Sequence, residues 1–396
     1  MIRDSCTEEC LDRARQEGDR LAEDTIGAIF SRGQRAAVNE AFDLLLRNDQ
    51  LPVERLPSEL REFIEKTSAL PDWVDVGEIG HAQRFFTSWG LLSLASLAAA
   101  GLPECYALGD EARVLAITRQ LTIHAPRRII ETAQLAVRVM EEGGLGPEGK
   151  GIRAAQKVRL LHATMRKLIL EDPPAELSAR PPQNHVEALE CCVWPKGDGV
   201  PISQEHLAYT LLTFSYVVPR SLERFGVAVS AKDWTAYLHC WNVVGHFLGI
   251  TSDLMAKTKE EAEWLFSRIK SRHQADTAEG RALTEAVLKW MQETLPFRFL
   301  SGIPRLVMWM LLDRATALSL GVPKPGWFGR TLISLYQAWP FGLKPNLILG
   351  RWMVSYLTAL PRGWERELFD LPASLQHRWG VKLRTKFRFE RNEKKE

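Results

Sequence analysis

One segment of the chain places a histidine between two arginines at helical spacing. Arg159, His162 and Arg166 stand at positions i, i+3 and i+7 of a stretch that reads as a helix over residues 152–171, so they share one stripe of it. An imidazole flanked by guanidinium groups suits an acidic or anionic group. The alternative is structural: both arginines pair with carboxylates elsewhere, and the histidine hydrogen-bonds a carbonyl oxygen.

A second segment combines histidines with glycines inside a predicted helix. His239, Asn242 and His246 fall at i, i+3 and i+7, while Gly245 and Gly249 lie four residues apart and form a flat strip. A glycine inside a helix costs about 1 kcal/mol relative to alanine, which indicates that the strip allows another helix or a planar ligand to approach closely. Simple helix packing around a hydrogen-bonded core His246 explains the same residues.

Several reaction classes lack their usual sequence motifs. The chain contains no HExxH or similar zinc spacing and no GxSxG, and its glycine-rich loop at 143–151 is no Rossmann fingerprint, because a predicted helix rather than a strand precedes it. Its six cysteines are sparse and form no CxxC pair, which indicates reduced thiols. Zinc hydrolases, serine hydrolases and dinucleotide-dependent dehydrogenases therefore have no support from the sequence.

The elements that must position these side chains are predicted to be helices. Apolar residues recur at helical spacing along most of the chain, and no sustained alternation predicts a sheet. We expect helices over residues 77–101, 110–122, 126–142, 152–171, 203–225, 231–250, 257–271 and 277–294. The predicted fold class is all-α, a single large helical domain whose pocket lies between helices 126–142, 152–171, 203–225 and 231–250.

Three parts of the chain differ in composition. Residues 1–66 read as a charged N-terminal helical cap, 67–295 as the core, and 296–396 as a Trp-rich helical extension packed on it. Residues 172–201 are rich in proline and glycine and are predicted to form a long irregular connection.

Length and charge restrict the class of protein and its partners. The 396 residues are 45% hydrophobic and 25% charged, which predicts a globular chain with a large core. A formal net charge of +2 gives no overall field for nucleic acid, which we do not expect as a partner. The amino terminus lacks an apolar stretch, and the longest uncharged apolar run, 89–102, is shorter than the roughly 20 residues of a spanning helix. We expect a cytoplasmic protein without a transmembrane helix.

Three motifs stand in order along the chain, KVRLLHATMR at 157–166, GVPISQEHLAYTLLTFS at 199–215, and WNVVGHFLGI at 241–250. Together they resemble an oxygenase family that includes latex clearing protein (rubber oxygenase) and the MpaB enzymes. The family pattern is R-x-x-H-A-x-x-R, then G-x-P-I-[NS]-Q-E-D, then W-x-x-[VI]-G-x-x-L-G. The resemblance covers residues 70–250 well and the rest only loosely.

This resemblance implies a helical fold with globin-like packing around haem b, and an oxygenase that uses dioxygen on a hydrophobic, isoprenoid-like or lipid-like substrate. Rubber-cleaving members place a proximal histidine two positions after the threonine that aligns with Thr210, where this chain has Leu212. Their distal lysine aligns with His162, and their arginine near the haem aligns with Arg159. The leucine departs from the pattern and puts cleavage of polyisoprene in doubt.

Axial-ligand chemistry supplies a hypothesis for the iron. Haem needs a strong axial donor, and imidazole is the commonest. We expect His246 as the proximal ligand, His162 as the distal ligand or proton relay, and His239 and His206 in reserve. The remaining cofactor-binding and catalytic candidates are Arg159 and Arg166 toward the propionates, Thr210 and Gly245 in the pocket, Asn242 as a partner of the ligating ring, and Glu131 or Glu148 as the carboxylate.

Two other functions are compatible with the same residues. Because Leu212 removes the expected ligand, the chain could be a non-catalytic lipid or isoprenoid carrier of the same fold. Residues 295–364 interleave tryptophans with arginines, which is typical of a peripheral membrane contact and equally of a domain core with snorkelling arginines.

Overall fold

The structure is a computed structural model that describes Ile2 and residues 6–31, 56–117, 125–147, 149–171, 185–293 and 300–338. Regular structure in these residues is helical, and their only β pairing is an isolated bridge between Leu108 and Gln274. The prediction of an all-α fold is confirmed.

The helices follow one another along the chain as α2 (Glu8–Gln16), α3 (Arg20–Phe30), α5 (Ser58–Lys66), α6 (Val76–Ser96), the π-helical η2 (Leu97–Gly101), α7 (Leu102–Tyr106), α8 (Gly109–Ile117), α10 (Ala125–Met140), α11 (Lys150–Leu170), α12 (His185–Glu190), the 3₁₀ turn η4 (Lys196–Asp198), α13 (Gln204–Ser215), α14 (Val217–Arg224), α15 (Ala231–Phe247), the 3₁₀ turn η5 (Ser252–Leu254), α16 (Lys259–His273), α17 (Ala278–Glu293), α18 (Ile303–Leu311), α19 (Arg314–Ser319) and α20 (Trp327–Ala338).

One predicted helix, 203–225, is divided in the structure. α13 ends at Ser215 and α14 begins at Val217, with Tyr216 between them. Pro219 has no N–H with which to reach the carbonyl of Ser215 four residues earlier, so a continuous helix would lose this hydrogen bond. The bend lets α13 and α14 pack on different neighbours.

The helical stretch Val76–Tyr106, which comprises α6, η2 and α7, runs through the interior. It is long and apolar enough to cross a membrane by length and composition, but 67% of its most apolar window is buried inside the molecule. α6 packs against α14 and α15, and α7 packs against α8 and α17. Burial among other helices explains the apolar composition of this stretch.

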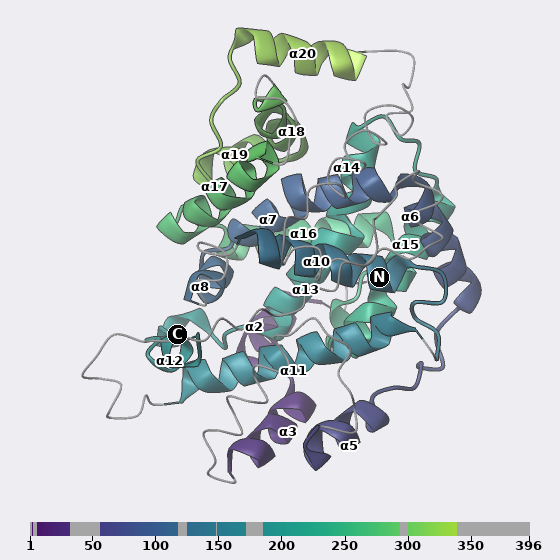
Figure 1. Ribbon diagram of the computed structural model, residues 1–396, viewed down its shortest axis with the longest axis vertical. Helices are drawn as coiled ribbons and strands as arrows, with labels where there is room; N and C mark the ends of the chain where they lie inside the picture. The colour runs from purple at the N-terminus through teal and green to yellow at the C-terminus, as the bar shows by residue number, and fades with distance from the viewer. Residues whose placement is uncertain are drawn as a thin grey trace, which may run out of the picture.

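Helix α11 separates two hydrophobic clusters. Figure 1 shows α11 crossing the lower part of the molecule, with α3 and α5 below it and the larger group of helices above. The smaller cluster joins α11 to α3 and α5 through residues such as Ile26, Phe63 and Leu160. The larger cluster contains α2, through Cys10 and Leu11, together with the central helices. The first helices thus belong to two different clusters, and the three-part division of the chain stays a prediction.

The C-terminal extension is described only in part. α18 packs against η2 and α17, and α20 packs against α18. Trp309 of α18 contacts the main core, whereas Trp327 at the start of α20 is 75% exposed. Residues 295–299 and 339–364 of the predicted membrane-contact region lie outside the described residues.

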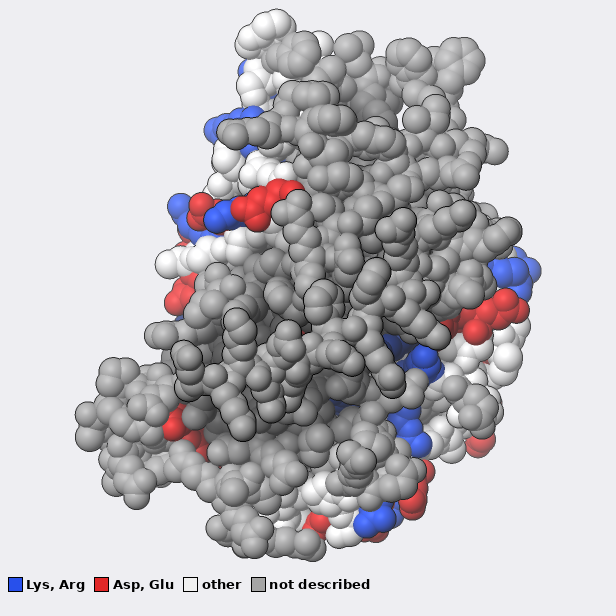
Figure 2. Space-filling view, in the orientation of Figure 1, with Lys and Arg blue, Asp and Glu red and all other residues white. Residues whose placement is uncertain are grey.

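Described charges of both signs are mixed on the surface. Figure 2 shows lysine and arginine side chains close to aspartate and glutamate side chains at several places where described residues reach this face. The arrangement agrees with the small net charge of the whole chain.

Gly249 ends α15 at a place where a side chain has no room. Its φ is +80°, and a Cβ built there would lie 2.3 Å from Asp19 Oδ2 and 2.6 Å from Arg159 Nε. Only glycine adopts this conformation without strain, and here the missing Cβ also leaves space for an ion pair.

We predict that Gly249→Ala destabilises the protein more than Gly226→Ala. Gly226 has the same φ of +80° but nothing within 4 Å of its built Cβ, so its replacement adds only the backbone strain of about 1–2 kcal/mol. Gly249→Ala should add about 1–3 kcal/mol for overpacking against the Asp19–Arg159 pair. Chemical denaturation of both variants measures the difference in the free energy of unfolding. Equal losses of stability in the two variants would show that the Asp19–Arg159 pair moves aside without cost.

Candidate active site

A cavity of about 240 Å³ lies in the helical core beside α11. Its walls come from α7, α8, α10, α11, α13 and α15, which include all four helices predicted to line a pocket. Most of the lining is apolar, as the side chains of Leu102, Val114, Leu115, Ile129, Leu135, Leu161, Met165, Leu207, Leu211, Phe214, Trp241 and Leu248 show. A few polar groups interrupt this lining, which is typical of a small-molecule site.

The structure brings His162 to the cavity and not the two arginines beside it in sequence. His162 is half-buried and lines the cavity, together with Val158 and Leu161 of the same helix. Seen down the helix axis, His162 lies about 60° around from Arg159 and about 40° from Arg166, because each residue turns a helix by about 100°. This offset places the imidazole on the cavity side of α11 and the guanidiniums toward α3.

Arg159 and Arg166 bind carboxylates of α3. Arg159 forms an ion pair with the buried Asp19 and places its guanidinium 5.3 Å from the centre of the Phe63 ring. Arg166 is 2% exposed and donates to Glu23 Oε1 at 2.7 Å and to the carbonyls of Pro201 and Ile202 at 3.0 and 2.8 Å. Both arginines therefore pair with carboxylates elsewhere in the fold, as the structural alternative predicted.

We predict that Arg166→Met lowers the free energy of unfolding by about 3–5 kcal/mol, because it leaves buried acceptors without their donor. Arg153→Met on the exposed face of the same helix is the control, and it should change stability by less than about 0.5 kcal/mol. Urea denaturation measures both variants. A stable Arg166→Met protein would mean that these contacts do not hold α11 to α3.

Glu111 is the most distinctive group in the cavity wall. Its Oε1 accepts a hydrogen bond from the Thr210 hydroxyl at 2.5 Å, and its Oε2 is buried with no partner among the described residues. Burial raises the pKa of Glu111 to about 7, against the opposing effects of the nearby His206 and of the Thr210 hydrogen bond. Thr210, a predicted pocket residue, therefore positions a carboxyl group at the cavity.

The histidines and glycines of the second predicted segment do not line the cavity, although Trp241 and Leu248 of the same segment do. His246 is exposed and meets Trp73 edge to face at 6.3 Å, and burial together with the nearby Arg159 lowers its pKa. A Cβ on the buried Gly245 would meet Leu211 Cδ2 at 2.7 Å, so this glycine serves the packing of α15 on α13. The geometry does not support the expectation that His246 is the proximal ligand.

The other residues of this segment have structural partners. His239 Nε2 accepts a hydrogen bond from the Asp75 backbone N–H at 2.9 Å. Asn242 donates to the carbonyl of Ala256 at 2.8 Å rather than to a histidine ring.

The remaining candidates are divided between the cavity, the core and the undescribed part of the chain. Glu131 of α10 and the reserve ligand His206 line the cavity. Leu212, at the position of the family's histidine, is buried and is not part of the lining. Glu148 lies outside the described residues.

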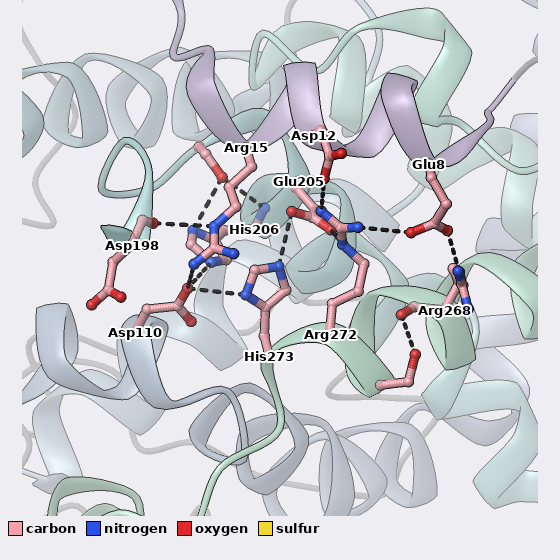
Figure 3. Close-up of polar contacts among 12 residues, drawn as sticks. Glu8, Asp12, Arg15, Asp110, Asp198, Glu205, His206, Arg268, Arg272 and His273 are labelled. Carbon is pink, nitrogen blue, oxygen red and sulfur yellow. Dashed lines mark hydrogen bonds and ion pairs between the residues drawn. The ribbon is translucent and has the colours of Figure 1, made fainter. Parts of the chain in front are cut away.

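A buried polar cluster adjoins the cavity at His206. Asp110 Oδ2 lies 2.9 Å from His206 Nε2 and 3.1 Å from His273 Nδ1. His273 Nε2 lies 2.8 Å from Glu205 Oε2, and Arg272 Nε donates to Glu205 Oε1 at 2.7 Å. Figure 3 shows this cluster below α2, whose acidic side chains face Arg268 and Arg272.

The two carboxylates hold a charge on one histidine of the cluster. Burial favours neutral His273, but its hydrogen bonds to Asp110 and Glu205 outweigh burial and raise its pKa to about 9. Burial acts on Asp110 in the opposite direction, and its hydrogen bonds to His206 and His273 hold its pKa well below the ordinary value.

Three residues of the site, Glu111, Asp110 and His273, were not predicted from the sequence. Acidic residues at the start of a predicted helix are ordinarily solvent-exposed and stabilise the helix dipole, so Asp110 and Glu111 gave no signal of burial. His273 closes a charged amphipathic helix, where a basic side chain is equally ordinary.

Comparisons with known proteins agree with this architecture. The sequence profile of the family described as ER-bound oxygenase mpaB/B'/Rubber oxygenase, catalytic domain, matches residues 83–383. The chain is 28% identical over 281 residues to the rubber oxygenase of Streptomyces sp. (strain K30), an alignment that takes in 68% of this chain and 62% of the relative. It therefore spans less than two thirds of the length of that curated relative.

A solved structure of latex clearing protein in the closed state has the same fold. It matches with a TM-score of 0.65 and 24% sequence identity, and the match covers 95% of this chain and 94% of that chain. The fold alone follows from this likeness, whereas the family follows from the profile that matches most of the chain. The protein belongs to the MpaB and rubber oxygenase catalytic-domain family.

Proposed function

We propose that this protein is a haem b-dependent oxygenase that uses dioxygen on a hydrophobic, isoprenoid-like or lipid-like substrate. The observation that carries the proposal is that one cavity combines a histidine, a buried carboxyl group and long apolar walls. Membership of an oxygenase family and a relative named rubber oxygenase supply the reaction class.

The residues of the cavity fit a haem. We assign the iron to His162, whose side chain lines the cavity from α11, and we assign His206 to its contacts with Asp110 at 2.9 Å and Ser203 Oγ at 3.2 Å. Arg138 and Lys157 also line the cavity and carry the charge that suits haem propionates. When bound, haem supplies the iron that activates dioxygen.

The chain itself supplies binding, exclusion of water and a proton-exchanging group. The apolar side chains of α8, α10, α11 and α13 hold a hydrocarbon chain and keep the reaction dry. Thr210 fixes Glu111 through its Oε1, and the other carboxylate oxygen is left for a proton to or from the substrate. Arg159 and Arg166 act at a distance by holding α11 against α3.

The experiment is an absorption spectrum of the purified full chain, oxidised and reduced, after supplementation with haem. We expect a Soret band with one haem per chain, and oxygen uptake when polyisoprene or a short isoprenoid hydrocarbon is added. A colourless protein that co-purifies with lipid would overturn the oxygenase proposal and favour the carrier.

The substrate is proposed only as a class. Leu212 departs from the pattern of the rubber-cleaving relatives, so we propose activity on short isoprenoid or lipid chains ahead of polymer. Comparing oxygen uptake with the polymer and with the short hydrocarbon measures this preference.

A further inference from the structure

We propose that Asp110, His206 and His273 bind a divalent transition-metal ion beside the cavity, separate from any haem. The three residues come from the start of α8, the first turn of α13 and the end of α16. The proposal does not rest on the proposed function, because it uses other residues and another ligand.

The ligand atoms already converge. One oxygen or nitrogen from each residue lies within 4.8 Å of the others, and Asp110 Oδ2 lies 2.9 and 3.1 Å from the two imidazole nitrogens. Zinc binds nitrogen and oxygen at about 2.0–2.2 Å, so tetrahedral ligands stand about 3.4 Å apart. Small side-chain rotations would therefore open the contacts enough to admit an ion.

The outer nitrogen of each imidazole is held by an acceptor. His206 Nδ1 lies 3.2 Å from Ser203 Oγ, and His273 Nε2 lies 2.8 Å from Glu205 Oε2. These contacts fix which ring nitrogen faces Asp110, Nε2 in His206 and Nδ1 in His273. Histidines that bind metals almost always donate their other N–H to such an acceptor, most often a carboxylate or a carbonyl.

Burial and ligand type indicate a transition metal. Asp110, His206 and His273 are 7%, 2% and 7% exposed, so little water reaches these side chains. Imidazole favours zinc, iron, copper or nickel over magnesium and calcium, which prefer oxygen ligands.

Of the two neighbouring arginines, Arg272 faces Glu205, Asp12 and Glu8 rather than the ligand atoms. Arg15 forms a long ion pair with Asp110 Oδ2 at 4.0 Å, which a bound ion would replace. A bound ion would connect α8, α13 and α16 and fix His206 in the cavity wall.

The test is a metal titration of the full chain after treatment with a chelator. Adding Co²⁺ should produce visible d–d absorption that saturates at one equivalent, and Zn²⁺ should displace it. Saturating Zn²⁺ should also raise the thermal midpoint, because an ion that binds only the folded chain stabilises it. A haem assay of the same sample measures the haem iron, which is subtracted from the total metal content.

Variants locate the site. His206→Gln and His273→Gln should each abolish the Co²⁺ absorption, and Glu205→Gln should weaken binding about 10–100-fold. The matched control is His81→Gln, because His81 Nε2 contacts Asp233 Oδ1 at 2.7 Å in a histidine–carboxylate pair without a second histidine among the described residues. Far-ultraviolet circular dichroism checks that each variant is folded.

The wild-type titration decides the proposal even if the variants unfold. Absence of stoichiometric Co²⁺ and Zn²⁺ uptake would overturn it and leave a proton shared between Asp110, His273 and Glu205. Uptake that survives in the folded His206→Gln and His273→Gln variants would overturn it equally.

Discussion

His162→Ala is expected to reduce the haem content of the purified protein by more than about tenfold, because the change removes the imidazole that we assign to the iron. His162 lines the cavity together with apolar side chains of α11, so its loss leaves the cavity walls in place. The ratio of Soret to protein absorption, calibrated by extraction of the haem, measures the effect.

Two other histidines make this result specific. His81→Ala should keep full haem content, since His81 pairs with Asp233 away from the cavity. His246→Ala separates the two ligand assignments, because His246 is exposed and does not line the cavity. Loss of haem in His246→Ala with retention in His162→Ala would reverse our assignment.

The fold could be read from the sequence because helical periodicity is a local property. α11 and α16 lie within two residues of the predicted bounds, and α15 ends at Phe247, three residues before the predicted position 250. The division between α13 and α14 was not predicted, although Pro219 was its signal. Local pattern therefore located helices better than it located breaks within them.

The site was predicted in part, because spacing along a helix does not say which neighbour a stripe meets. The motif around His162 and Thr210 pointed to residues that do line the cavity. The same motif included Arg159 and Arg166, which lie only about 40–60° around the helix yet face α3. No pattern within the sequence joins Glu111 to Thr210, which are 99 residues apart.

Glu111→Gln is expected to lower the rate of substrate-dependent oxygen uptake by about 10²- to 10⁴-fold, the range typical of a lost general acid or base. Glutamine keeps an oxygen to accept the Thr210 hydrogen bond, but it replaces the unpartnered carboxylate oxygen with an amide that exchanges no proton in the reaction. Oxygen uptake with a short isoprenoid hydrocarbon measures the rate.

Haem content and stability distinguish a chemical role for Glu111 from a structural one. Because the two side chains have the same shape, we expect Glu111→Gln to keep its Soret band and to change the free energy of unfolding by less than about 1 kcal/mol. Glu131→Gln, on the same cavity wall, tests the other carboxylate. If Glu131→Gln is slow and Glu111→Gln is fully active, the proton-exchanging group is Glu131 of α10. If the Glu111→Gln protein is colourless, Glu111 is part of the haem site.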